Sequence, residues 1–438
     1  MHATVGDAWD LFFMGLGFCN DAITNLEERS AESMNISEED RAAFIAELRA
    51  NRAYYYLGIM DLWGNAPIST KVGEPEMPAT NNRQEIFDFV ESEILDVLDD
   101  LPLLSQEEQN CGRFTRAAGY AMLATLYLNA EEWTGTARWD DCITYCDHLI
   151  NGDGGGQNGP IQLDDDIYKP FSNTNSEDSR ENILVLSYDY MASGVKCGWA
   201  GDFYHFNQRY IYGGTDNGND GVVVIPSAYD MFEDNDLRKQ NWMLIGPQYD
   251  YNTGEPVVGT SEYTGQPLVF VREIMRYSEG DTTTSTMYTG EENSGARFNK
   301  YNPGPLSDPN YYGNDWVLYR LTEFYFDKAE ALMRQNGGKA TQEAVDLINA
   351  CRQRAFSAED WPNEKYTTAT LTLDELLAER GREFIFEGKR RTDLIRFGKF
   401  LTESWWDHTP TTSEHLKIFP IPYDQTSLNP NLVQNEGY

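Results

Sequence analysis

The chain is short of basic residues, and this shortage limits its partners. Its 438 residues include 34 lysines and arginines against 71 aspartates and glutamates, so the formal net charge at pH 7 is −37. A charge of this sign repels phosphate backbones and anionic lipid headgroups. We therefore expect no nucleic-acid partner and no direct attraction to a membrane surface.

Long apolar runs are also missing. No stretch approaches the roughly 18 to 20 apolar residues of a membrane-spanning helix, and the N-terminus lacks the basic and apolar regions of a signal peptide. Met1 and His2 are typical of a start introduced by cloning, so a targeting segment upstream is not excluded. Apolar residues still make up 40% of the chain, which is enough for a large buried core.

Residues that build metal and nucleotide sites lack the required spacing. The six cysteines form no CxxC pair, the five histidines form no HExxH motif, and no phosphate-binding glycine loop occurs. Cys142 and Cys146, one helical turn apart, favour a buried helix face over a metal site. The acidic segment 163–169 lacks the spacing of an EF-hand and is typical of a solvated turn. We expect no metal, no cofactor and no catalytic residues.

Helical periodicity and capping residues mark both ends of the chain. Ser37, Asn82 and Thr115 each precede an apolar stripe with helical spacing. The N-terminal helices are predicted over 37–63, 82–102, 115–133 and 139–150. The C-terminal helices are predicted over 316–335, 341–356 and from 372 through the charged segment LDELLAERGREFIFEGKRRTDLIRFG. Antiparallel helix pairs follow, and residues 115–150 resemble a tetratricopeptide unit.

The middle of the chain, residues 151–315, differs in amino-acid composition from both ends. It is rich in Gly, Asn, Asp, Ser and Thr with isolated tyrosines and tryptophans, and it has only brief apolar stretches such as ILVLSYDY and GVVVIP. Ordered loop regions of this length are commonly functional. We predict a helical part over 1–150, a loop-rich ligand-binding region over 151–315 and a helical part over 316–438, folded as one compact unit.

Four blocks of the sequence resemble the SusD/RagB family. They are NRAYYYLGIMDLWGNAPIST at 51–70, the segment 112–151, the segment 319–356, and the terminal blocks at 373–398 and 418–438 that end in PIP and QNEGY. They occur in the family's order over nearly the whole chain. The resemblance implies a mostly α fold, in which four tetratricopeptide-like helix pairs support an irregular ligand-binding portion with a few short strands.

The resemblance also implies a location and a partner. Members of the family are surface lipoproteins of the outer membrane of Bacteroidetes, and they capture glycans or peptides for a SusC-like TonB-dependent transporter. They usually carry a lipidated cysteine near the mature N-terminus, and no residue here matches it, since Cys19 lies within an apolar helical pattern. We expect a surface-exposed lipoprotein whose anchor lies outside this sequence.

Aromatic residues favour a glycan as the ligand. Sugar rings have apolar C–H faces bordered by hydroxyls, so aromatic rings and Asn, Asp, Gln or Arg side chains suit them. Aromatic residues are 13% of the chain, and many stand beside small polar residues. For each aromatic residue the alternative is packing of a loop against the helices. The candidate ligand-binding residues are Trp63, Asn65, Trp199, Tyr204, Arg209, Tyr212, Asp216, Asn217, Trp242, Tyr249 and Tyr251.

The expected function is non-catalytic binding of an oligosaccharide or polysaccharide and its delivery to the transporter. One alternative is a glycoside hydrolase that uses two loop carboxylates, although no glycosidase signature stands out among the 71 acidic residues. Another is a tetratricopeptide scaffold that binds a peptide or protein.

The opposite charges of 373–398 lie three or four residues apart, which favours a structural ion network.

Overall fold

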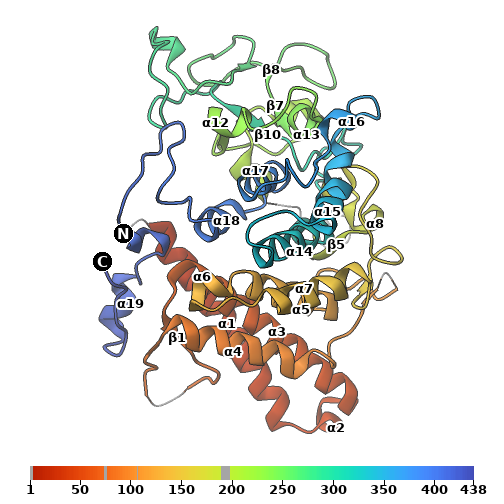
Figure 1. The fold of residues 1–438 in the computed structure, drawn as a ribbon. Coiled ribbons are helices and arrows are strands. Elements are labelled where there is room, and N and C mark those ends of the chain that lie inside the picture. The colour runs from red at the N-terminus through yellow and green to blue at the C-terminus, as the bar shows by residue number, and fades with distance from the viewer. Residues whose placement is uncertain (1–2, 74–75, 106, 189–197) are drawn as a thin grey trace.

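The computed structural model describes residues 3–73, 76–105, 107–188 and 198–438, and it is mostly helical (Figure 1). The N-terminal helices are α1 (Ala3–Glu28), α2 (Ala31–Met34), α3 (Glu38–Trp63), α4 (Arg83–Val97), α5 (Arg116–Leu128), α6 (Ala130–Thr134) and α7 (Trp139–Ile150). Among the described residues, no helix is long and apolar enough to cross a membrane. Neighbouring helices pack in sequence order, with α3 against α1 and α4, and α5 against α7.

The predicted N-terminal helices 37–63 and 139–150 are confirmed, whereas the helix expected over 82–102 ends at Val97 and the one expected over 115–133 is two helices. Asn129 ends α5, where its side chain donates to the Thr125 carbonyl at 2.9 Å, and α6 follows it.

The starts of the helices have clear causes. Ser37 and Asn82 accept hydrogen bonds from backbone N–H groups of the first turn, and each forms a reciprocal capping box. Thr115 caps α5 in the same way without the reciprocal bond. The chain leaves α7 through Gly152, whose φ of 80° is a conformation that glycine adopts without strain.

The C-terminal helices cover the N-terminal layer and carry the loop-rich lobe above it (Figure 1). They are α14 (Leu321–Gln335), α15 (Gln342–Arg352), α16 (Trp361–Glu364), α17 (Leu373–Glu383), α18 (Arg390–Arg396) and α19 (Tyr423–Leu428), with the short helices η3 (Gln353–Ala355) and η4 (Glu414–Lys417). Helix α14 packs against α7 below it and α15 beside it. Gln425 of α19 donates to Asp10 at 3.0 Å, so the two ends of the chain meet.

Two predictions about the C-terminal part are wrong. The helix expected from residue 316 begins only at Leu321, because β11 (Trp316–Arg320) pairs antiparallel with β5 (Asn182–Leu186). The charged segment 373–398 is two helices rather than one. Phe386 and Gly388 have φ values of 67° and 75°, and this left-handed connection separates α17 from α18.

The loop-rich middle region contains only short elements. Its helices are η1 (Lys169–Phe171), α8 (Asn175–Asp178), α10 (Trp199–Phe203), α11 (Arg209–Tyr212), α12 (Pro226–Tyr229), α13 (Leu237–Asn241) and η2 (Tyr277–Glu279). The remaining strands of the chain are β1 (Ala66–Pro67), β2 (Thr80–Asn81), β3 (Leu104–Ser105), β4 (Gly155–Gly156), β6 (Val223–Val224), β7 (Met243–Leu244), β8 (Gly246–Pro247), β9 (Val269–Phe270) and β10 (Ala296–Phe298). Strands β6, β10 and β7 form a three-stranded antiparallel sheet.

One large apolar core joins the helical layer to the loop-rich lobe. It runs from Trp9 in α1 to Ile421 near the C-terminus and includes Phe298 of β10. Cys142 and Cys146 belong to this core, and burial raises the pKa of the Cys146 thiol well above its usual value. A mostly helical fold with a few short strands is therefore confirmed, whereas the tetratricopeptide-like nature of the pairs and the three-part division stay predictions.

Candidate functional site

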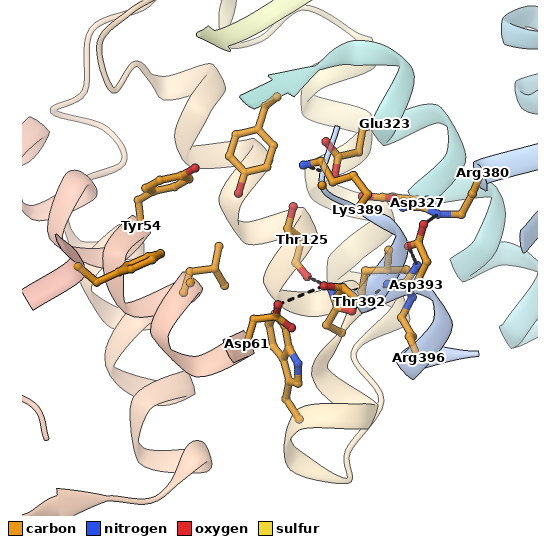
Figure 2. A pocket seen from close by; sticks show the side chains of 18 residues that line it. Tyr54, Asp61, Thr125, Glu323, Asp327, Arg380, Lys389, Thr392, Asp393 and Arg396 are labelled. Atoms are coloured by element: carbon orange, nitrogen blue, oxygen red, sulfur yellow. Dashed lines mark hydrogen bonds and ion pairs between the residues drawn. The ribbon is translucent and has the colours of Figure 1, made fainter. Parts of the chain in front are cut away.

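A cavity of about 230 Å³ lies between α3, α5 and the C-terminal helices. Figure 2 labels ten of its lining residues: Tyr54, Asp61, Thr125, Glu323, Asp327, Arg380, Lys389, Thr392, Asp393 and Arg396. Lys389 lies 2.9 Å from Glu323. Asp393 lies 2.9 Å from Arg380 and 2.7 Å from Arg396. These charges neutralise one another, so the wall of the cavity is an internal ion network.

The network continues from α17 into the loop-rich lobe. Glu383 accepts from Arg238 at 2.9 Å and from Arg320 at 3.0 Å, and all three side chains are buried. Burial raises the pKa of Glu383, but Arg320, Arg354 and Arg238 lower it more strongly, to about 2. The expected structural ion network is thus confirmed, and it fastens the lobe to the helices.

Four of the candidate ligand residues are buried. Trp63 packs edge-on against Trp9 with ring centroids 5.2 Å apart, and Tyr204 lies 5.5 Å from Tyr212. The ring of Trp242 lies 3.8 Å from the Lys300 ammonium. Trp63, Tyr204, Tyr212 and Trp242 are all between 0% and 3% exposed. They therefore offer no free ring face to a sugar, and packing against the scaffold explains them better.

Four further candidates, Asn65, Asp216, Asn217 and Trp199, lie at structural or surface positions or outside the described side chains. Asn65 accepts from the backbone N–H of Arg83 at 3.1 Å and donates to Asn435 at 3.1 Å, which ties the end of α3 to the C-terminus. Asn217 is exposed and Asp216 is half-buried in the loop after α11. Trp199 begins α10, and its side chain lies outside the described part of the structure.

Three exposed tyrosines lie where α11 meets the loop after β8. Tyr210 is 37% exposed, and Tyr249 and Tyr251 are each 54% exposed. The backbone N–H of Tyr251 donates to the carbonyl of Tyr210 at 2.9 Å, which joins the two segments. The Arg209 guanidinium lies 4.7 Å from the centre of the Tyr210 ring and donates to its hydroxyl at 2.9 Å. We call Arg209, Tyr210, Tyr249 and Tyr251 the tyrosine platform.

A tight hairpin holds the platform tyrosines in place. Tyr249 pairs with Pro256 across the hairpin, and the Asp250 carboxylate accepts from the backbone N–H groups of Asn252 and Thr253 at 2.8 and 2.9 Å. Gly213 ends α11 with φ 72°, and a Cβ there would lie 3.3 Å from the Tyr251 ring. The site is therefore pre-formed by turn geometry rather than by its own side-chain packing.

Polar groups border the tyrosine platform. Arg209 donates to the carbonyl of Thr215 at 3.3 Å, and the Thr215 hydroxyl donates to Asn310 at 2.8 Å. Asn252 is exposed beside Gly213. Aromatic faces beside guanidinium, amide and hydroxyl groups can stack on a sugar ring and bond its hydroxyls. The arrangement suits a ligand that stays partly hydrated when bound and extends beyond the site.

The sequence predicted part of this platform. Arg209, Tyr249 and Tyr251 were among the candidates, whereas Tyr210 and Asn310 were not. Tyr210 is adjacent to Arg209 in a dense aromatic segment, so the signal was present, but nothing in the sequence distinguishes it from the buried Tyr204 and Tyr212. Asn310 lies about a hundred residues away in sequence and could be found only from the fold.

The fold is that of a mostly helical protein whose loop-rich lobe carries three exposed tyrosines. Residues 147–438 match the sequence model of the SusD family. This match covers more than half of the chain, and the chain belongs to that family.

Relatives and solved structures agree with this assignment. The chain is 27% identical to the starch-binding protein SusD of Bacteroides thetaiotaomicron over 426 residues, which cover 90% of this chain and 72% of the relative. It is 23% identical to SusD-like protein P25 of Formosa agariphila over 469 residues, covering 99% of this chain and 80% of that protein.

Two solved structures show the same fold. A SusD superfamily protein from Parabacteroides distasonis superposes with a TM-score of 0.75 at 20% identity, covering 99% of this chain and 86% of that one. Surface glycan-binding protein A from Bacteroides thetaiotaomicron, in complex with laminarihexaose, gives a TM-score of 0.69 at 22% identity, covering 98% and 85%.

Proposed function

We propose that this protein binds an oligosaccharide or polysaccharide at the tyrosine platform, without cleaving it. The observation that carries the proposal is the set of three exposed tyrosines, of which Tyr249 and Tyr251 lie on a hairpin and Tyr210 lies beside Arg209 on α11. Support comes from a relative named starch-binding and from a protein of the same fold that was solved with laminarihexaose. The family further supports delivery of the glycan to a SusC-like TonB-dependent transporter at the cell surface, by a lipid-anchored form of the protein.

Binding at such a surface should be modest in affinity. The tyrosines are about half exposed, so a bound sugar keeps much of its hydration, and stacking contributes roughly 0.5–1.5 kcal/mol per aromatic contact. Three exposed tyrosines allow contacts with more than one sugar of the same chain. Retention beside a transporter then depends on effective concentration more than on tight binding.

Affinity electrophoresis with neutral polysaccharides tests the proposal. We expect starch or laminarin to retard the protein, and the Tyr210→Ala/Tyr251→Ala double variant to bind at least about tenfold more weakly, because two stacking contacts are lost. Tyr423→Ala is the matched control, since Tyr423 is 75% exposed on α19, a different element from the platform. Equal retardation of the double variant and the wild type would place the site elsewhere.

Release of reducing ends, measured on the same samples, separates binding from hydrolysis. Retardation without release is the expected result. Release that disappears when a loop carboxylate is changed would replace our proposal with a glycoside hydrolase.

A further inference from the structure

A groove of about 740 Å³ lies between α12, α17, α18 and the segment 399–405, away from the residues of the tyrosine platform. Its volume is within the range of small-molecule sites, roughly 300–1,000 Å³. Most of its lining is apolar: Ile225, Ala228, Met231, Leu377, Ala378, Leu394, Phe400 and Trp405. The rest of the lining is polar: the charged side chains of Asp374, Arg390, Arg391, Lys399 and Glu403, together with Ser227 and Ser404.

Arg390 differs from the other arginines of α17 and α18. Arg380, Arg382, Arg391 and Arg396 each form an ion pair with a carboxylate. Within the described part of the chain, Arg390 has no ion pair, and its only hydrogen bond goes from Nη1 to the carbonyl of Leu377 at 2.7 Å. A half-buried guanidinium with free N–H groups is costly unless an acceptor reaches it. The groove therefore contains an unused anion-binding group.

The other charged side chains of the groove already have partners. Lys399 lies 3.1 Å from Asp374 and 3.0 Å from Glu403, so one ammonium group partly neutralises both carboxylates. Arg391 pairs with Asp61 at 3.3 Å and turns toward α3. An anion in the groove would therefore meet Arg390 as its main partner. In a chain with a net charge of −37, such a site favours one acidic group over a polyanion.

Trp405 supplies a fixed aromatic wall. Its indole stacks on the His408 imidazole with ring centres 3.8 Å apart and planes 2° apart, and the backbones of the two residues exchange hydrogen bonds. The ring is thus oriented before any ligand binds. An indole that lines an apolar groove suits the C–H face of a sugar, and the planar guanidinium of Arg390 suits a carboxylate in the bidentate geometry.

We propose that this groove is a second carbohydrate site, and that it binds a uronic acid residue with its carboxylate on Arg390 and its ring against Trp405. The proposal rests on the glycan-binding function proposed above, but on different residues. The two sites then take different parts of a mixed glycan, neutral sugars on the tyrosine platform and an acidic residue in the groove.

Titration calorimetry with a trisaccharide that carries a single terminal galacturonic acid residue tests the site, and its methyl ester is the matched ligand without charge. We expect the acid to bind and the ester to bind at least about tenfold more weakly, because a charge-assisted pair is lost. Arg390→Gln should weaken binding of the acid about tenfold or more and leave the ester unchanged. Equal binding of acid and ester would overturn the proposal, as would the absence of binding to either.

Three further variants keep the test decisive. Trp405→Ala should lower the affinity for both the acid and the ester. Trp406→Ala is the matched control and should change neither affinity, because Trp406 lines the neighbouring pocket and its Nε1 donates to Ser285 at 3.0 Å. If Arg390→Gln does not fold, Arg390→Lys decides: it keeps the charge but loses the planar fork, and unchanged affinity for the acid would contradict the geometry. Retardation by starch or laminarin should be unaffected throughout, so failure of this site is distinguishable from failure of the platform.

A peptide with a free C-terminal carboxylate is the control for ligand class. Binding of such a peptide that depends on Arg390, without binding of the trisaccharide that carries one galacturonic acid residue, would refute the assignment to a sugar.

Discussion

Replacing Glu383 with Gln should strongly destabilise the fold. The Glu383 carboxylate is buried and accepts from Arg320, Arg238 and Arg354 at 3.0, 2.9 and 3.3 Å. These partners lower its pKa from 4.5 to about 2. Each tenfold change in proton affinity corresponds to about 1.4 kcal/mol, so the ionised form contributes roughly 3 kcal/mol. Removal of one partner from a buried ion pair typically costs about 3–5 kcal/mol, which agrees.

The pH dependence of this contribution has a definite sign. Because the pKa is lower in the folded state than in the unfolded state, the unfolded chain binds more protons between about pH 2 and 4.5. The contribution of Glu383 is therefore complete above pH 4.5 and is lost as the pH falls toward 2. In the Gln variant this part of the acid sensitivity should be absent.

Urea denaturation followed by tryptophan fluorescence measures the change in the free energy of unfolding. Asp234→Asn is the matched control, since Asp234 is fully exposed and its ion pair with Lys239 should contribute at most about 1 kcal/mol. A loss below 1 kcal/mol for Glu383→Gln, equal to that of the control, would refute the argument that the buried network fastens the lobe to the helices.

Three smaller perturbations should have separate signatures. Ser37→Ala removes the cap of α3 and should lower the free energy of unfolding, measured by urea denaturation, by about 0.5–2 kcal/mol without changing glycan retardation. Reduced retardation would contradict a purely structural role. Gly213→Ala places a Cβ at φ 72° beside Tyr251, so it should lower the free energy of unfolding by about 1 kcal/mol and also weaken retardation by neutral glycans. Full retention of binding would show that the position of the hairpin is unimportant. Burial, then Arg297, lowers the pKa of His205 to about 4, so the unfolded chain binds more protons between pH 4 and 6.5 and stability should fall across that interval as the pH decreases. His205→Gln should flatten this part of the profile of Tm against pH, and an unchanged profile would exclude His205 as its cause.

The sequence by itself determined the helices whose signals are local. Ser37, Asn82 and Thr115 cap helices because their side chains bond the first turn of the same segment, so no distant contact is needed. Apolar periodicity located the buried stripes for the same reason. The terminal blocks also resembled the SusD/RagB family, and the match over residues 147–438 confirmed that membership.

Tertiary structure decided whatever depends on distant partners. Trp316–Arg320 is a strand because residues 182–186 lie beside it, although its own pattern fits a helix. The break between α17 and α18 requires a left-handed Phe386, which sequence patterns do not predict. For the platform, Tyr204, Tyr210 and Tyr212 are equivalent in sequence, yet only Tyr210 is well exposed. The exposure of a side chain depends on all the segments that pack around it. The residues next to it in the sequence do not determine that packing.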